Sequence, residues 1–387
     1  MNSKNLAHQH DGSVDVIVIG GGISGLGVAV EAQRRGHKTL LLERSVSLAT
    51  GTSANSLKII HGGFRYLQTL QIGRVLNSIV AQGQLVRRHP NLFEPLPCLM
   101  RLERFGLKSR WPVTCAAFAF GVMARGLSWP AKERRPCVRV DVDGMVGVRL
   151  GMPVLQWWDW RLKSHEALVN VLADEFTRAG GVVRCEALVV EAKSATLEAS
   201  VISEGGEEFR GKVVIDCRGS GVPSPKVNSW AVAFNLLLSK AINPTYGIAA
   251  SAHKRLLFAV PRPEVNAAPG AVGTWYVPGT DADPFSEEKP EVSEQEIAGA
   301  IADVNAAIPE ANLQRNEVMG IESGVLPCVS APGERPIRLL GRERIETFGR
   351  IIKVVSTKYT TFETQARWAV NTAEEIFKSN RPKPPTS

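Results

Sequence analysis

The segment from Gly51 to Tyr66 contains the side chains best suited to chemistry, and it reads GTSANSLKIIHGGFRY. Its histidine, His61, is a candidate general base, because an imidazole can take up a proton near neutral pH. The alternative is a structural histidine before the Gly62–Gly63 turn. Arg65 precedes Tyr66, and a guanidinium binds a carboxylate or phosphate through a planar fork of donors. The alternative for this pair is an ordinary Arg-Tyr at the start of a helix.

A glycine-rich turn precedes this segment and predicts a dinucleotide site. Residues 14–19 are nearly all apolar, as expected of a parallel strand that is buried on both faces. Gly20, Gly22 and Gly25 then follow G-x-G-x-x-G spacing, which allows a tight turn, a close approach to a pyrophosphate and close packing of the helix. A helix over 24–35 would direct its first N–H groups and its positive dipole end at the phosphates.

An acidic residue completes this unit. We expect the second strand over 38–42, and Glu43 stands at its end. A carboxylate about 20 residues after the glycines binds a ribose hydroxyl of adenosine, and it disfavours NADP, which would place a phosphate there. The unit alone does not distinguish FAD from NAD.

Length, charge and cysteine content exclude several classes of protein. The 387 residues suffice for two domains, and no stretch reaches the roughly 18 apolar residues of a transmembrane helix. The first twelve residues are polar and lack an apolar signal core, so we expect a cytoplasmic protein. The six cysteines are scattered, which is typical of buried thiols and not of a metal site or disulfide framework. The net charge of +8 is dispersed, so we expect an anionic substrate or a membrane surface as partner and no nucleic acid.

The remaining pattern predicts an α/β protein. We expect helices over 71–88, 293–308 and 362–379, and a fourth from 164 to the Gly180–Gly181 turn. Residues 96–155 have an irregular pattern. A Rossmann-type domain of residues 1–95, 155–228 and 335–387 would be interleaved with a mixed α+β substrate domain of residues 96–154 and 229–334.

A family resemblance becomes specific in the run GTSANSLKIIHGGFRYLQ. It resembles the segment after the second strand in the FAD-dependent glycerol-3-phosphate dehydrogenases, which belong to the D-amino-acid-oxidase-like superfamily of flavoproteins. The runs PNLFEPLPCLMRL, VIDCRG and STKYTTF are also similar to segments of that family. The resemblance implies that the Rossmann-type domain binds FAD. It also implies that hydride passes from a substrate C–H to flavin N5 while a base takes the hydroxyl proton.

The resemblance further implies roles for individual residues. Catalysis would involve His61, Arg65, Arg342 and Lys358. Substrate binding would use the three cations together with Tyr66 and Asn235. The residues expected to contact FAD are Gly20, Gly22, Ile23, Ser24, Gly25, Glu43, Arg44, Thr52, Ser53, Ser56, Lys58, His61, Gly62, Gly63, Leu188, Gly219, Lys358, Tyr359 and Thr360. For Lys58 the alternative is a solvated cation.

This chain departs from the family pattern at several positions. Leu326 replaces a substrate-pocket arginine, Asn235 a histidine, Asn55 an arginine and Ser356–Thr357 a pair of glycines. The sequence also ends soon after the last expected helix, so we expect no C-terminal helical domain. FAD binding stays expected, and the substrate is left open among small anionic compounds.

Two apolar segments each have two interpretations. Residues 110–129 are too short to span a bilayer and fit either an interfacial anchor, with Trp and basic residues at both ends, or a buried helix. In the resembled dehydrogenases the corresponding region dips into the membrane, which adds a peripheral place on its inner face and a quinone or another electron acceptor as partner. Residues 157–160 could line the pocket, although we favour a core at the domain interface.

The sequence therefore predicts an FAD-dependent oxidoreductase that oxidises the C–OH of a small anionic substrate such as glycerol 3-phosphate. The first alternative is an amine, amino-acid or 2-hydroxy-acid oxidase of the same superfamily. Such an enzyme needs no histidine base if an amine arrives neutral. The second alternative is a flavin-binding subunit without catalysis.

Overall fold

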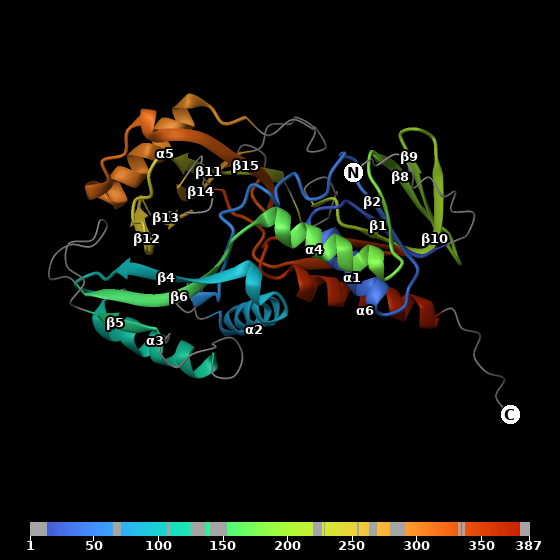
Figure 1. Cartoon of the computed structure of the whole chain (residues 1–387), viewed down its shortest axis with the longest axis horizontal. Helices are drawn as coiled ribbons and strands as arrows, with labels where there is room; N and C mark the ends of the chain where they lie inside the picture. The colour runs from blue at the N-terminus through green and yellow to red at the C-terminus, as the bar shows by residue number, and fades with distance from the viewer. Residues whose placement is uncertain are drawn as a thin grey trace.

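Two β-sheets and the helices packed on them make up the described part of the chain (Figure 1). The computed structural model describes residues 14–64, 71–106, 109–124, 136–139, 153–219, 227, 229–253, 255–262, 269–278, 291–331, 334 and 337–379.

The first sheet has the strands β1 (Val14–Ile19), β2 (Thr39–Leu42), β7 (Val182–Arg184), β8 (Val189–Ser194), β9 (Ala199–Ser203), β10 (Glu208–Asp216), β16 (Arg344–Phe348) and β17 (Ile351–Val355). The second sheet has β3 (Ile59–Ile60), β4 (Phe93–Arg101), β5 (Cys137–Arg139), β6 (Val154–Leu162), β11 (Ser229–Leu238), β12 (Gly247–Ala252), β13 (Arg255–Pro261), β14 (Gly270–Pro278) and β15 (Val318–Cys328). The helices are α1 (Ile23–Arg34), α2 (Ile72–Arg88), α3 (Arg110–Met123), α4 (His165–Arg178), α5 (Glu294–Ala307) and α6 (Phe362–Ser379), with 3₁₀ turns η2 (Pro90–Leu92), η5 (Pro309–Ala311) and η6 (Arg315–Glu317).

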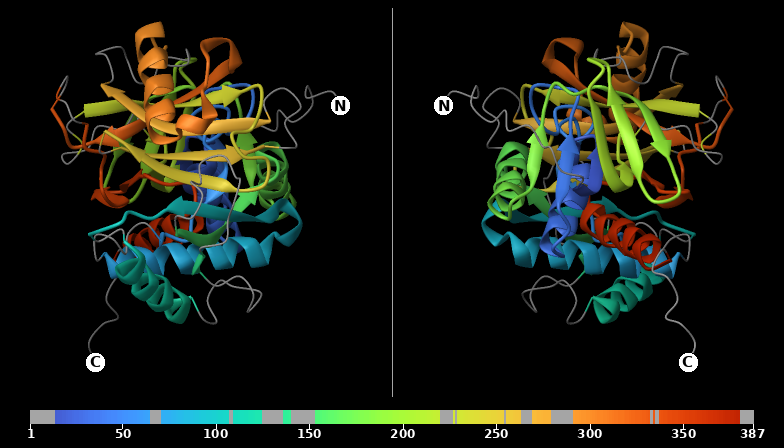
Figure 2. Two further views of the ribbon diagram at one scale, coloured as in Figure 1. Left: turned by 90° about the vertical axis from the view of Figure 1, so that its left-hand side faces the viewer. Right: turned by 90° about the vertical axis from the view of Figure 1, so that its right-hand side faces the viewer.

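The first sheet is the Rossmann-type layer, with the order β16-β17-β10-β1-β2-β7. The strands β17, β10, β1, β2 and β7 are parallel, and β1 is buried on both faces. The helices α1, α4 and α6 cover one face, and the antiparallel β8–β9 hairpin lies over the other (Figures 1 and 2). Close packing of α1 on α6 depends on Gly27, because a Cβ there would lie 2.6 Å from the ring of Phe362.

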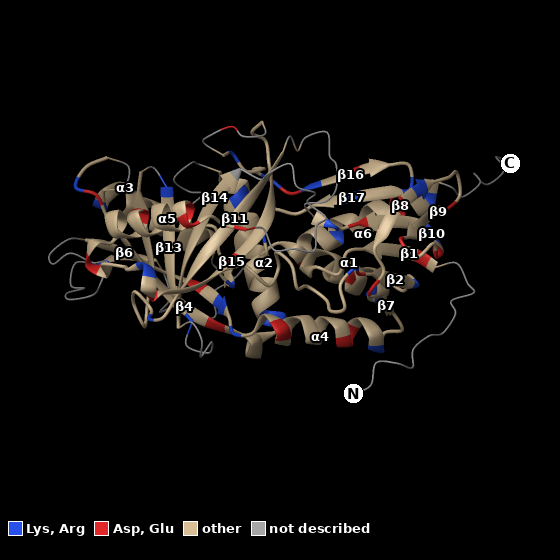
Figure 3. Cartoon of the chain, turned by 90° about the horizontal axis from the view of Figure 1, so that it is seen from above, with Lys and Arg blue, Asp and Glu red and all other residues tan. Residues whose placement is uncertain are grey.

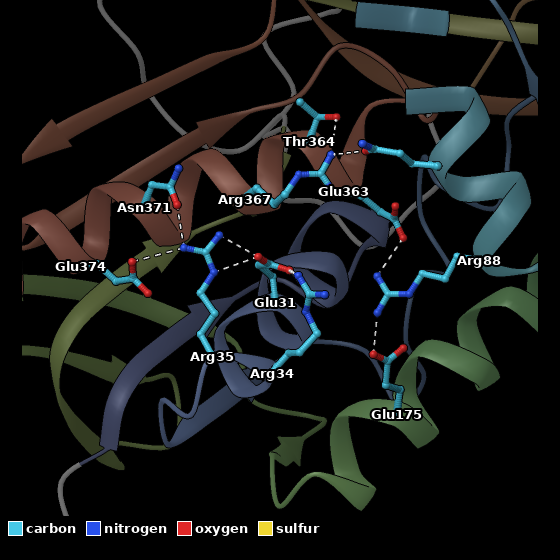
Figure 4. Close-up of polar contacts among 11 residues, drawn as sticks. Glu31, Arg34, Arg35, Arg88, Glu175, Glu363, Thr364, Arg367, Asn371 and Glu374 are labelled. Carbon is cyan, nitrogen blue, oxygen red and sulfur yellow. Dashed lines mark hydrogen bonds and ion pairs between the residues drawn. The ribbon is translucent and has the colours of Figure 1, made fainter. Parts of the chain in front are cut away.

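A network of charges ties the helices of this layer together (Figure 4). Glu31 of α1 is buried and binds Arg35 at 2.7 Å, and Arg35 continues to polar side chains of α6. Arg88 of α2 bridges Glu175 of α4 at 2.6 Å and Glu363 of α6 at 3.1 Å. These pairs fix the outer side of the helix layer, and charges of both signs are spread over the other described elements as well (Figure 3).

The second sheet has the order β15-β11-β14-β13-β12-β4-β6-β3, with β5 on β6. The helix α5 packs on one face, and α2 and α3 pack on the other (Figure 2). The short strand β3 belongs to this sheet although it follows directly on the first βαβ unit. The segment from Gly51 to Gly63 therefore carries the chain from the Rossmann-type sheet to the second sheet.

Most expected elements are confirmed. The helices over 71–88, 293–308 and 362–379 are α2, α5 and α6, and Ser164 caps α4 through a 3.0 Å bond to the Ala167 N–H. The expectation that residues 96–155 are irregular is wrong, because they include most of β4 and all of α3. Two prolines obscured β4: Pro95 and Pro97 precede the stretch from Cys98 to Met100 that pairs with β12, so they lie where the strand has one partner.

The sheet membership also differs from the expected division of the chain at two places. The strand β6, which lies within residues 155–228 except for Val154, pairs with β4 in the second sheet, and β3 pairs with β6 in the same sheet. The sequence pattern places β3 and nearly all of β6 in the Rossmann-type domain. The strong apolar character of β6 does not indicate which sheet it joins, since either sheet would bury it.

Candidate active site

The turn between β1 and α1 is shaped to hold a phosphate. Gly20 has a φ of +95°, and a Cβ on Gly25 would lie 1.8 Å from the Gly20 carbonyl oxygen, so both positions require glycine. Gly22 stands at the N-cap without a side chain, and the first turn of α1 has no acidic residue. Ser53 reaches this helix end, because its Oγ accepts the Ile23 N–H at 3.1 Å. The positive end of the helix is thus suited to a pyrophosphate.

Glu43 lies beside this turn. Its carboxylate accepts the N–H of Gly21 at 2.5 Å and the N–H of Ser45 at 2.9 Å. Each carboxylate oxygen keeps a further lone pair for a ribose hydroxyl. The N–H of Ala187 donates to the Glu43 carbonyl at 2.8 Å, which brings the next residue, Leu188, to the same sheet edge.

Two segments distant in sequence meet the turn. Gly219 has a φ of +70° and follows β10, where the Cys217 N–H donates to the Ile19 carbonyl at 2.8 Å. The Tyr359 hydroxyl lies 3.0 Å from His165 Nδ1, and His165 Nε2 lies 3.0 Å from the Ala49 carbonyl. Burial lowers the pKa of His165 and raises that of Tyr359. Both rings are therefore neutral links between the C-terminal segment and the loop after β2.

The loop after β2 rests on the second sheet. The Val325 N–H donates to Thr52 Oγ1 at 3.0 Å, and Gly324 is needed there because a Cβ would lie 2.8 Å from the Thr52 methyl group. Asn235 Nδ2 donates to the Asn55 carbonyl at 3.1 Å. Asn235 therefore supports the loop backbone.

Lys58 is a buried cation in this loop. Its Nζ donates to the Ala54 carbonyl at 2.8 Å and to Glu322 Oε1 at 3.0 Å, and Arg262 reaches the same oxygen at 3.0 Å. Burial lowers the pKa of Lys58, and Glu322 opposes that shift. The side chain is 12% exposed, which rules out the solvated cation. Sequence patterns gave no indication of Glu322 or Arg262.

His61 forms a pair with a buried carboxylate. Its Nδ1 lies 2.9 Å from Asp159 Oδ2, and the Gly62 N–H donates to Asp159 Oδ1 at 2.8 Å. The Trp157 indole N–H adds a bond of 3.2 Å. Burial alone would raise the pKa of Asp159, which is 3% exposed, but these three donors and the nearby imidazole hold that pKa below its ordinary value. Asp159 is thus an ionised partner that orients His61.

The pair faces a cavity of about 840 Å³ on the α3 side of the second sheet. The described residues that line it are Leu57, His61, Gly63, Phe64, Met100, Trp157, Asp159, Ala249, His253, Arg255, Leu256, Phe258, Gly273, Thr274, Tyr276 and Ile337. The pairing of β11 with β14 shifts at Phe234/Asn235, so Thr274 is an extra residue in β14. Such a bulge redirects side chains next to a binding site, and here both Gly273 and Thr274 face the cavity.

The structure brings some of the predicted residues together and leaves others apart. His61 and Gly63 line the cavity, and Asn235 borders it through a 3.3 Å bond from Thr274 Oγ1. Arg342 is exposed and Lys358 is half-buried, and neither lines the cavity. Arg65 and Tyr66 lie outside the described residues. Asp159 was not among the predicted site residues, although an acidic residue within a run of three tryptophans was a usable signal.

Comparisons with known proteins decide the family. A family model described as FAD dependent oxidoreductase matches residues 15–348. The chain belongs to this family. Glycerol-3-phosphate dehydrogenase 2 of Mycobacterium tuberculosis is 26% identical over 391 residues, covering 94% of this chain and 63% of the relative. The chain thus spans less than two thirds of that relative's length.

Solved structures of the same fold include enzymes with different names. L-alpha-Glycerophosphate oxidase from Mycoplasma pneumoniae, with FAD bound, has a TM-score of 0.69 at 15% identity over 97% of both chains. Glycine oxidase from Geobacillus kaustophilus has a TM-score of 0.64 at 14% identity over 95% of both chains. The family resemblance seen in the sequence, the α/β fold class and the cofactor FAD are confirmed, because FAD is the cofactor of this family.

The residues present fit FAD. The glycine turn, the uncapped end of α1 and Glu43 would hold the ADP part. In the segment 356–362, Thr357 Oγ1 is buried without a hydrogen-bond partner among the described atoms. A buried hydroxyl of this kind is accounted for by a bound group that supplies the partner. Thr357 lies just before Tyr359, whose link to Ala49 places it by the loop after β2.

Proposed function

We propose that this protein oxidises a C–OH group of an anionic substrate, with FAD as hydride acceptor and His61 as the base that takes the hydroxyl proton. The observation that carries the proposal is the His61–Asp159 pair at the cavity. When bound, FAD supplies the redox chemistry, because its ring accepts a hydride. The relatives named glycerol-3-phosphate dehydrogenase support an anionic hydroxy compound as the substrate class.

Asp159 determines which nitrogen of His61 is free. A carboxylate only accepts hydrogen bonds, so Nδ1 carries the ring proton and Nε2 keeps a lone pair. The His61 side chain is 46% exposed, and a substrate hydroxyl in the cavity could reach it. The negative charge of Asp159 would stabilise the imidazolium after proton uptake, as a buried aspartate does in a hydrolase triad.

Aromatic side chains give the pair a weakly polar surrounding. The ring of Phe258 contacts His61 at a centroid distance of 5.4 Å, and Trp157 stacks on both Phe258 and Phe64 at 6.3 and 6.0 Å. A low local dielectric strengthens the interaction of charges that remain in the site. These rings would therefore exclude water and strengthen the effect of Asp159 on His61. Arg65, Arg342 and Lys358 remain proposed cations for the substrate.

A second candidate function is the oxidation of an amine or amino acid. Its support is the likeness of the fold to the structure named glycine oxidase. An amine that arrives neutral can lose hydride without a base, so this reaction would not depend on His61. The third possibility from the sequence is a flavin-binding subunit without catalysis. It does not explain why an ionised Asp159 orients His61 at the cavity.

Anaerobic mixing of the FAD-loaded protein with candidate substrates separates these functions. We expect a hydroxy acid or hydroxy phosphate to bleach the visible flavin absorbance, and His61→Asn to slow that bleaching about 100- to 10,000-fold. Asn keeps a donor for Asp159 but cannot act as a base. Bleaching by amines alone, unaffected by His61→Asn, would support the second function and contradict the first.

We also propose that α3 contacts a membrane surface, where a quinone or another acceptor would reoxidise FAD. Trp111 and Phe118 are 76% and 73% exposed, and Phe105 and Arg110 are exposed nearby. Aromatic and basic side chains together suit the headgroup region of an anionic bilayer. None of the described helices is long and apolar enough to cross a membrane.

Co-sedimentation with anionic liposomes tests this contact. Phe118→Asp should weaken binding, whereas Val171→Asp, at an exposed apolar residue of α4, should not. Equal binding of both variants and of the unaltered protein would contradict the role of α3.

A further inference from the structure

The bulge in β14 brings a hydroxyl group to the cavity that His61 lines. The hydroxyl belongs to Thr274, the extra residue of the bulge, which also lines the cavity. The preceding residue, Gly273, pairs with Phe258 of β13, and the Phe258 ring lies 5.4 Å from the His61 ring. Thr274 thus follows the strand partner of the residue that packs on His61.

The Thr274 hydroxyl lies on the cavity face of the second sheet. Along β11, Phe234 and Leu236 belong to the core under α5, so Asn235 between them points to the opposite face. Asn235 Oδ1 lies 3.3 Å from Thr274 Oγ1, which places that hydroxyl on the same face. Gly273 leaves room for this contact, because a Cβ there would lie 2.0 Å from Asn235 Oδ1.

The direction of two hydrogen bonds is determined by the atoms that they join. The Asn55 carbonyl can only accept, so the Asn235 group 3.1 Å from it is the amino group. The Asn235 oxygen therefore faces Thr274, and the Thr274 hydroxyl donates its one proton to that oxygen. Asn235 is 3% exposed, so this oxygen is shielded from solvent. Thr274 is left with lone pairs for a ligand in the cavity.

A hydroxyl that can only accept selects its ligand. A carboxylate or phosphate oxygen at Thr274 would bring lone pairs against lone pairs, whereas a hydroxyl group of the ligand would donate a hydrogen bond. An ammonium group could also donate, but the imidazolium that the proposed reaction forms at His61 would repel it. The reacting hydroxyl cannot serve Thr274, because its proton goes to His61. The donor is therefore a second hydroxyl group.

We infer that Thr274 is a specificity-determining residue that accepts a hydrogen bond from a second hydroxyl group of the substrate. Asn235 would be the positioning residue that keeps Thr274 an acceptor. The inference rests on the proposed function for the reacting group, whereas binding of a hydroxyl at Thr274 does not require turnover. The substrate would then be an anion with at least two hydroxyl groups, of which one is oxidised.

Three phosphates that differ at one carbon test the second hydroxyl. Glycerol 3-phosphate has a hydroxyl there, 3-amino-2-hydroxypropyl phosphate an ammonium group, and 2-hydroxypropyl phosphate only hydrogen. We would measure the second-order rate constant of anaerobic flavin reduction by each compound. Thr274→Val keeps the shape of the side chain and should lower the constant for glycerol 3-phosphate about 3- to 10-fold, with no change for 2-hydroxypropyl phosphate. Equal losses for both, or a loss for the ammonium compound alone, would overturn the inference.

Further variants distinguish a specific contact from a general disturbance. Thr274→Ser restores the hydroxyl and should recover most of the loss seen in Thr274→Val. Thr177→Val, at an exposed threonine of α4, is the matched control and should change none of the three rate constants. A loss in Thr274→Ser as large as that in Thr274→Val would count against the hydroxyl.

Asn235→Ala tests the positioning role. It frees the Thr274 proton, so the hydroxyl can also donate. The compound 2-hydroxy-3-methoxypropyl phosphate, whose ether oxygen can only accept, should then gain relative to glycerol 3-phosphate. The gain should disappear when Asn235→Ala is combined with Thr274→Val. A gain that persists without the hydroxyl would reflect added space alone and would overturn the role of Asn235.

Binding of two ketones separates the inference from the reaction itself. Dihydroxyacetone phosphate keeps the second hydroxyl, and hydroxyacetone phosphate lacks it. Titration of each into the FAD-loaded protein, followed by the visible flavin spectrum, gives the two dissociation constants. Dihydroxyacetone phosphate should bind about 3- to 10-fold more tightly, and Thr274→Val should remove that difference. If no hydroxy compound bleaches the flavin but this difference depends on Thr274, the proposed reaction fails and the hydroxyl site stands. If the ketones bind alike or not at all, the hydroxyl site fails.

Discussion

Asp159→Asn removes one charge from the centre of the site and changes little else in shape. Asp159 accepts hydrogen bonds from His61, Gly62 and Trp157, and Gln82 Nε2 lies 3.4 Å from its Oδ1. Asparagine has one oxygen and one amino group in place of the two carboxylate oxygens. If the oxygen keeps the Gly62 N–H, the amino group faces both His61 Nδ1 and the Trp157 N–H.

The expected loss of activity follows from the tautomer of His61. Opposite an amino group, Nδ1 must accept, so the ring proton moves to Nε2 and that nitrogen can no longer take a proton from the substrate. The same substitution in the hydrolase triad lowers kcat about 10,000-fold, and general base catalysis as a whole is worth about 100- to 10,000-fold. We therefore expect a loss of about 100- to 10,000-fold in the rate of flavin reduction.

The expected loss of stability follows from the Trp157 N–H. It would face another donor in a buried place, which costs about 1–3 kcal/mol, and bonds to a charged acceptor would be weakened as well. We expect the free energy of unfolding to fall by about 2–4 kcal/mol. Asp174→Asn, at an exposed aspartate of α4, is the matched control and should change neither quantity.

Anaerobic stopped-flow reduction of the flavin measures the rate, and denaturant unfolding measures the stability. In a double-mutant cycle, His61→Asn combined with Asp159→Asn should be no slower than the slower single variant, because the two residues act as a unit. A folded, FAD-loaded Asp159→Asn protein that reduces its flavin within about threefold of the unaltered rate would refute the reasoning. Fully multiplicative effects in the cycle would do the same.

Three further predictions follow from single contacts. Gly25→Ala places a Cβ 1.8 Å from the Gly20 carbonyl oxygen and should abolish FAD binding, measured as visible absorbance per protein. Gly73→Ala, with open space around it, is the control and should keep its flavin. Full flavin content in Gly25→Ala would contradict the assignment of the glycine turn as the FAD site. Glu322→Ala leaves Lys58 and Arg262 buried without their carboxylate and should lower the free energy of unfolding, measured with denaturant, by about 3–5 kcal/mol. Glu310→Ala, at an exposed glutamate, is the control and should cost less than about 1 kcal/mol. An equally small cost for Glu322→Ala would show that the carboxylate does not stabilise the two cations. The pKa of Asp159 is lowered from 3.8 in the folded protein, so its contribution to stability is present above pH 3.8 and is lost as the pH falls through the folded value. Below about pH 4 the free energy of unfolding should therefore fall more steeply with pH in the unaltered protein than in Asp159→Asn. Parallel plots of the free energy of unfolding against pH for the two proteins would contradict this.

Local sequence patterns predicted the fold where an element is determined by its own residues. The glycine turn and the helices expected over 71–88, 293–308 and 362–379 are specified by residues within each segment, and all of these are in place. The pattern failed in β4, where prolines are tolerated because β12 pairs only with residues 98–100. It also could not assign β6 to a sheet, because partner choice depends on strands far away in sequence.

Of the His61–Asp159 pair, only His61 was predictable from the sequence. His61 stands in a segment whose composition indicates chemistry, but Asp159 lies 98 residues away on another strand, and only the β3–β6 pairing brings the two together. Glu322 has the same difficulty, since it lies on β15, 264 residues after Lys58, and only the fold brings its carboxylate to 3.0 Å from Lys58 Nζ. Residues that act through a partner in another element leave no local signal.

If a hydroxy compound loses hydride beside His61, its C–H bond breaks in the step that reduces the flavin. We would measure anaerobic flavin bleaching by an anionic hydroxy substrate with hydrogen or deuterium on the carbon that bears the hydroxyl. We expect both forms of the substrate to bleach the flavin. The deuterated form should do so more slowly, because the bond from that carbon to hydrogen or deuterium breaks in this step. Absence of bleaching by every hydroxy compound tried, or bleaching by amines alone, would contradict it.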